Sequence, residues 1–81
     1  MDDPAITLAP NPGSGVFVLT WPEAFGPVDV EVFSSVGQSV LSVHDLPSGS
    51  ELDLQGLSDG MYVVHILRDE GVSYKRLILQ R

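Results

Sequence analysis

The sequence predicts an all-β fold, namely an immunoglobulin-like antiparallel β-sandwich of about seven short strands. Short apolar runs recur every ~8 to 12 residues, separated by Gly, Pro, Asn, Asp and Ser, which is the spacing of sandwich strands. Several runs alternate apolar and polar residues, and helical periodicity is missing throughout. Since 81 residues suit one small core, we expect a single domain over residues 1–81, with residues 1–4 flexible.

Turn formers and proline divide the chain into these strands. Pro22 lacks a backbone N–H and therefore ends the second strand. Residues 10–15 form a turn between the first two strands, residues 36–38 a hairpin turn, and residues 69–71 a tight turn before the last strand. In order, the expected strands are residues 6–8, 16–21, 28–33, 39–44, 50–54, 61–67 and 72–79.

The third expected strand shows the alternation most clearly. Val28, Val30 and Val32 share one face, whereas Asp29 and Glu31 share the other. Such a strand packs with one face and meets water with the other.

The last two expected strands are more apolar. Residues 61–67 carry apolar side chains on both faces, so both faces are expected to be at least half buried. The final strand returns antiparallel to this one, with Leu77 and Leu79 on its inner face. Leu57 is the one apolar residue in the preceding connection, and we expect it to plug the end of the core.

Charge is distributed unevenly along the chain. The net charge of -7 disfavours binding to nucleic acid or to an anionic membrane surface, and no run approaches the ~18 apolar residues of a membrane span. Residues 1–67 hold nine carboxylates and no Lys or Arg, whereas residues 68–81 hold all four basic residues. The last strand is therefore the one locally cationic element, which marks it for a partner unless these side chains pair with neighbouring carboxylates.

The sequence offers no catalytic constellation, and we expect that the protein is not an enzyme. Nucleophilic catalysis needs a Ser or Cys held against a base. Cysteine is absent, and His44 and His65 lie in expected strands without a nucleophile-elbow motif nearby. We expect His65 to be a partly covered sheet residue and His44 a surface residue at a strand end.

Calcium binding is the main competing idea for a ligand. Asp29, Glu31, Glu51 and Asp53 could form one acidic patch if their strands are neighbours, because hard cations take carboxylate oxygens. The chain lacks the dense acidic loop of a typical calcium site, however. We therefore expect no metal and no cofactor.

Aromatic residues raise a second alternative, a carbohydrate-binding surface. Trp21, Phe25 and Phe33 are expected to be more exposed than Phe17 and Tyr62, which fit the inward pattern. Single exposed aromatic residues are common on protein surfaces, so they do not establish a sugar platform.

Five motifs follow one another and together suggest a family. They are Pro10-Asn11-Pro12; residues 15–19, GVFVL; residues 28–33, VDVEVF, with Gly37; residues 52–64, LDLQGLSDGMYVV; and residues 75–79, KRLIL. In this order they resemble the type A C-terminal sorting domain of the type IX (Por) secretion system of Bacteroidetes. The residues taken to matter structurally are Pro10, Asn11, Pro12, Gly37, Leu54, Gly56, Leu57, Gly60 and Tyr62.

Two of these residues have roles that local chemistry predicts. Asn11, between two prolines, is expected to hydrogen-bond locally and to stiffen the exit from the first strand. Gly60 is expected to adopt a positive φ before Tyr62 enters the sheet. The chain departs from the family at Ala9, where an aromatic residue is usual, so the anchoring of the Pro-Asn-Pro turn is open.

The resemblance implies a function in protein export. Such a domain is excised here from a larger secreted protein, follows an N-terminal cargo domain, and directs that cargo through the periplasm and across the outer membrane to the cell surface or the medium. The implied partners are the type IX translocon, an outer-membrane shuttle protein and a sortase-like peptidase that cleaves the domain from its cargo. Recognition is expected at the C-terminal strand, at Lys75, Arg76, Leu77, Ile78 and Leu79.

Two other roles suit the same fold. One is an immunoglobulin-like or fibronectin-like spacer, and the other is a carbohydrate-binding module, each within a modular surface enzyme. A spacer would hold neighbouring domains apart, and a carbohydrate-binding module would lose its ligand on replacement of Trp21 or Phe25.

Overall fold

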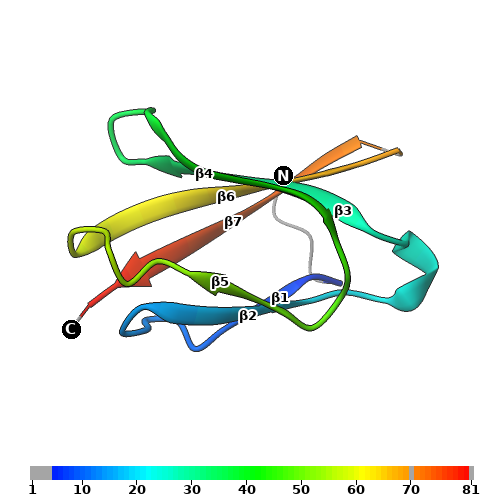
Figure 1. The fold of residues 1–81 in the computed structure, drawn as a ribbon, viewed down its shortest axis with the longest axis horizontal. Coiled ribbons are helices and arrows are strands. Elements are labelled where there is room, and N and C mark those ends of the chain that lie inside the picture. Colours follow the sequence, from blue (N-terminus) through cyan, green and yellow to red (C-terminus); the bar gives the residue numbers. More distant parts are fainter. Residues whose placement is uncertain (1–4, 70, 81) are drawn as a thin grey trace.

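A computed structural model describes residues 5–69 and 71–80 as a sandwich of two β-sheets (Figure 1). The expectation that residues 1–4 are flexible lies outside these described residues. The elements are β1 (Thr7–Ala9), β2 (Val16–Thr20), the 3₁₀ helix η1 (Glu23–Phe25), β3 (Val28–Ser34), β4 (Ser39–Leu46), β5 (Ser50–Asp53), β6 (Gly60–Arg68) and β7 (Gly71–Leu79). All seven expected strands are present, and η1 is an element that the sequence pattern did not predict.

The two sheets contain three and four strands. One has the order β1-β2-β5 and the other the order β4-β3-β6-β7, and neighbouring strands are antiparallel. The predicted fold class is therefore confirmed. In an immunoglobulin constant-type domain, the fourth strand pairs with the fifth. Here β4 pairs with β3 instead, so the sheet that contains β7 has four strands and the other sheet has three.

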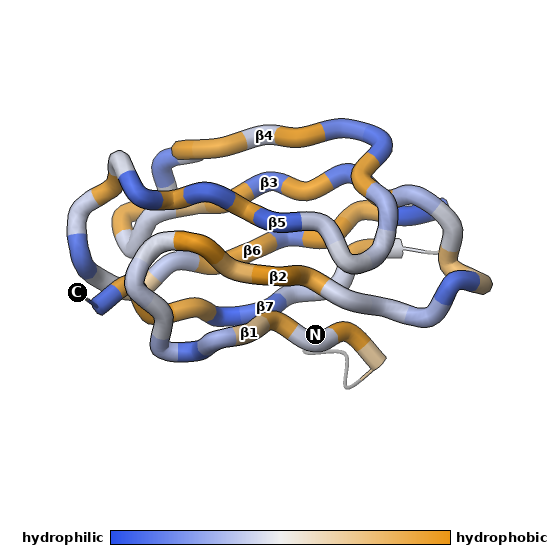
Figure 2. The backbone as a smooth tube through the Cα atoms, turned by 60° about the horizontal axis from the view of Figure 1, so that its bottom comes forward, coloured by the Kyte–Doolittle hydropathy of each residue, from blue (hydrophilic) through white to orange (hydrophobic). Residues whose placement is uncertain are grey.

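The core lies between the two sheets. It is built by every second side chain along the strands, because alternate residues of a strand point to the same face. Hydrophobic and hydrophilic residues alternate along β3 (Figure 2). Val28, Val30 and Val32 are at most 2 % exposed, as this alternation predicts. The buried apolar residues are Ile6, Phe17, Leu19, Trp21, Val28, Val30, Val32, Leu52, Leu54, Tyr62, Val64, Ile66, Leu77 and Leu79. Each such side chain contributes about 1.5–3 kcal/mol when it is fully removed from water.

Trp21 is a member of this core, so its expected exposure is wrong. Its side chain is 4 % exposed, and its Nε1 donates a 2.9 Å hydrogen bond to the Gly26 carbonyl. Its backbone is also held, because its N–H donates to the Ser48 Oγ and its carbonyl accepts from that hydroxyl. A surface that stacks on sugar therefore cannot be built on Trp21 in this conformation.

The outer face of β6 is more open than the sequence suggested. Val63 and His65 are half-buried, but Met61 is 47 % and Leu67 is 40 % exposed. Within the described part of the chain, no helix is long and apolar enough to span a bilayer.

The core assignment predicts a large cost for truncating Leu52, the inward residue of β5. Leu52→Ala should lower the free energy of unfolding by about 2–5 kcal/mol, because it leaves a cavity between the sheets. The matched control is Val36→Ala in the hairpin turn, where Val36 is 85 % exposed and the change should stay within about 0.5 kcal/mol. Urea unfolding followed by the fluorescence of the single Trp measures both; equal effects would contradict the packing of β5.

Candidate functional site

The two histidines form no catalytic pair among the residues described. His44 lies at the surface with its Nδ1 3.5 Å from an Asp29 carboxylate oxygen, as expected for an exposed strand residue. His65 is half-buried on the outer face of β6, where its ring lies between those of Phe33 and Tyr74, at centroid distances of 4.5 and 4.6 Å. In residues 5–69 and 71–80, no hydrogen bond joins either histidine to a serine.

The acidic patch considered for calcium does not form. Asp29 and Glu31 lie on β3, whereas Glu51 and Asp53 lie on β5, which belongs to the other sheet. The structure shows no group of three or more metal-ligating side chains among the residues that it describes. The alternation of polar and apolar residues assigns each carboxylate to one face of its strand, but it does not show which strands are neighbours. The acidic patch could therefore not be predicted or excluded from the sequence.

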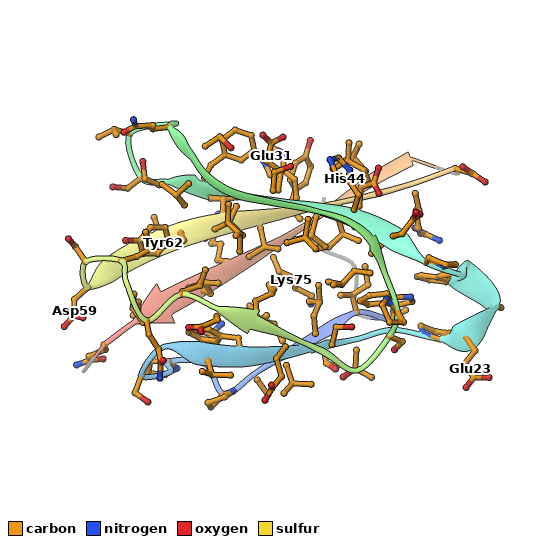
Figure 3. The ribbon with its side chains drawn as sticks, viewed as in Figure 1. Glu23, Glu31, His44, Asp59, Tyr62 and Lys75 are labelled. Atoms are coloured by element: carbon orange, nitrogen blue, oxygen red, sulfur yellow. The ribbon has the colours of Figure 1, made fainter. Side chains whose placement is uncertain are left out.

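The five residues expected to carry recognition lie on β7, at the edge of the four-stranded sheet, but they face two ways. Leu77 and Leu79 point into the core and are at most 1 % exposed. Arg76 and Ile78 point away from the core and are exposed. Lys75 is half-buried on the inner side of the strand, which faces the three-stranded sheet (Figure 3).

Asn11 binds the outer edge of β7, which the sequence did not predict. Its side-chain Nδ2 donates to the carbonyl of Arg76 at 2.8 Å, and its Oδ1 accepts from the N–H of Ile78 at 3.0 Å. One donor and one acceptor thus meet the edge as a neighbouring strand would. The expected local hydrogen bond is therefore wrong, and the partners are 65 and 67 residues away in the sequence.

Gly13 extends this contact toward the C-terminus. Its N–H donates to the Ile78 carbonyl at 3.0 Å, and its carbonyl accepts from the N–H of Gln80 at 2.8 Å, as part of a parallel bridge to β7. A Cβ at position 13 would lie 2.6 Å from the Phe17 ring and 2.8 Å from the Pro10 carbonyl oxygen, so only glycine fits. We call Asn11 and Gly13 the edge clasp.

The prolines of the family motif frame the edge clasp. The peptide bonds preceding Pro10 and Pro12 are both cis. The turn is anchored without an aromatic residue at Ala9, because Asn11 and Gly13 hold it to β7. Sequence reasoning missed Gly13, although its place directly after Pro-Asn-Pro was a signal of a close backbone approach.

The second family motif shapes the connection between β5 and β6. Gly60 has φ of 152°, the positive value that its role required. The Tyr62 hydroxyl donates to the Ser58 carbonyl at 2.6 Å, which ties the loop to β6 much as the tyrosine corner does in immunoglobulin-like sandwiches. Leu57 packs against the core as the predicted plug, and its N–H donates to the Leu54 carbonyl.

Gly37 and Gly56, two glycines of the family motifs, differ in whether their positions require glycine. Gly37 has φ of 85° in the hairpin between β3 and β4, where its N–H donates to Ser34. A Cβ on Gly56 would meet open space, so nothing in the structure explains a glycine there.

Comparison with known proteins places these features in one family. A family model described as "Secretion system C-terminal sorting domain" matches residues 7–80, which is nearly the whole chain. No curated protein matches the sequence.

The edge clasp predicts a selective effect of Asn11→Ala. Losing two hydrogen bonds that water can partly replace should cost about 1–3 kcal/mol of stability. The amide N–H of Ile78 should also exchange with solvent faster, whereas amides in the middle of β6 keep their protection. The control is Ser14→Ala, at an exposed position of the same turn. Unchanged exchange at Ile78, measured by NMR, would contradict the role of Asn11.

Proposed function

The chain belongs to the family of secretion system C-terminal sorting domains, and from this premise we propose that the export machinery reads it through β7. The family is that of type IX secretion, so the domain is a sorting signal for export to the cell surface or the medium in Bacteroidetes. The proposal concerns how this signal is recognised.

The observation that carries the proposal is the combination of position and charge at β7. β7 borders its sheet, and it contains two of the four basic residues of a chain with net charge -7. Arg76 and Ile78 are exposed on its outer face, where a partner can contact them. Complementary charge accelerates encounter and selects the partner, while an apolar neighbour supplies buried area.

The inner face of β7 has a different role in this proposal. Leu77 and Leu79 are in the core, so they keep the strand in place and do not contact a partner directly. Their removal impairs recognition by unfolding the signal. In this proposal the partner contacts Arg76 and Ile78, whereas Leu77 and Leu79 hold the strand in the core. Lys75 is half-buried and belongs to neither group.

The partners of this proposal are those of a type IX signal: the translocon and an outer-membrane shuttle protein. A sortase-like peptidase that removes the domain from its N-terminal cargo fits the same pathway. A spacer role needs only the fold, and it gives no reason for basic residues to gather in the last part of an acidic chain. We therefore favour the signal over the spacer.

Export of a reporter tests this function. A fluorescent protein with a signal peptide, fused ahead of residues 1–81 in a type IX-competent host, should reach the surface or medium. Deletion of residues 75–81 should trap it in the periplasm. Full export of the deletion variant would refute the assignment to β7, and failure of the intact fusion would refute the signal itself.

A double substitution separates recognition from folding. Arg76→Glu with Ile78→Glu should reduce export by about tenfold or more while the melting temperature changes little, because both side chains are exposed. Val18→Glu is the matched control, since Val18 is 37 % exposed on the other sheet. If the control and the double variant are exported equally, the outer face of β7 is not what the machinery reads.

A further inference from the structure

The outer edge of β7 is closed at one end and open at the other. Hydrogen bonds from the edge clasp reach Arg76, Ile78 and Gln80, which shows that the even-numbered residues direct their N–H and C=O groups away from β6. Val72 and Tyr74 have the same parity. Among the residues described, no hydrogen bond reaches their outward backbone groups.

The outer face of the β6–β7 hairpin carries most of the large exposed hydrophobic side chains among the described residues. Five of the seven large hydrophobic side chains that are exposed lie on the outer face of the β6–β7 hairpin, at 38–47 % exposure: Met61, Leu67, Val72, Tyr74 and Ile78. Register places Met61 opposite Ile78 at the clasped end of the hairpin, and Leu67 opposite Val72 at the open end, where Tyr74 lies opposite His65. Several exposed hydrophobic side chains gathered on one face of a hairpin are typical of an interaction site.

Charge next to this surface indicates the kind of partner. Arg76 is exposed on the outer face at the point where the open edge ends, and Lys75 is half-buried on the inner side. A neighbouring strand would place a carboxylate favourably beside Arg76. Lys75 also disfavours indiscriminate pairing of edges, because an inward-pointing charge on an edge strand must keep contact with water.

We propose that the edge at Val72 and Tyr74 docks an extended strand of the export partner, with apolar side chains beside those two residues and an acidic side chain near Arg76. This inference rests on the proposed function, and it adds a backbone contact at Val72 and Tyr74 to the side-chain contacts proposed at Arg76 and Ile78. The added strand hydrogen-bonds to the outward groups of Val72 and Tyr74 and stops at Arg76, because Asn11 already occupies the Arg76 carbonyl. The edge clasp therefore sets the register of docking.

Removing one outward N–H tests the proposal. Tyr74→Pro deletes that donor but leaves the β6 ladder intact, and proline is tolerated on edge strands whose N–H faces solvent. Export of the reporter fusion should fall by about tenfold or more. Tyr74→Thr is the control that keeps the N–H, and it should be exported better than Tyr74→Pro. Equal export of Tyr74→Pro and the parent overturns the inference alone, whereas an unexported parent overturns the proposed function.

A second measurement does not depend on the proline variant being folded. Benzoylphenylalanine in place of Tyr74 in the reporter fusion should cross-link, in the type IX-competent host, to an outer-membrane component of the export machinery. The same group in place of Val18, which is equally exposed on the other sheet, should not. Cross-linking only to a second copy of the chain, only to its own N-terminal residues, or equally from both positions would overturn the inference.

Discussion

The side-chain amide of Asn11 takes the place of a missing strand beside β7, and much of the architecture depends on this contact. The N-terminal segment pairs with β2 through β1 and then reaches β7 through Asn11 and Gly13, so it joins the edges of both sheets. A chain of 81 residues without cysteine has few other means of fixing its termini. In such a small domain, the four hydrogen bonds of the edge clasp are a substantial part of the net stability.

The sequence allowed the strands to be predicted, because a half-buried strand records its two faces in successive residues. The valines of β3 and the inward leucines of β7 were assigned correctly from parity alone. Trp21 has the same parity as Phe17 and Leu19, which are both buried, so its burial was also readable. The side-chain pattern thus continues one residue past the end of β2 at Thr20.

Contacts between distant segments could not be predicted in the same way. Asn11 was assigned a local hydrogen bond because a single sequence shows only neighbours, and its actual partners lie on the last strand. The acidic patch failed for the same reason, since β3 and β5 belong to different sheets. The cationic character of the last strand was visible in the sequence. Only the structure shows which face of β7 lies toward the core, and therefore that Lys75 is half-buried on the inner side while Arg76 is exposed on the outer side.

A recognition strand at a sheet edge has to remain readable without joining other edges at random. The unpaired backbone groups that make it readable are also those that promote aggregation. In this domain the two demands are met at different positions of β7: the edge clasp covers the end near Ile78, and the groups of Val72 and Tyr74 stay open. Lys75 lies between these ends and is half-buried on the inner side of the strand. Under the proposed mode of docking, a partner strand has to match a short register and a local charge, and this combination would give a small signal domain its selectivity.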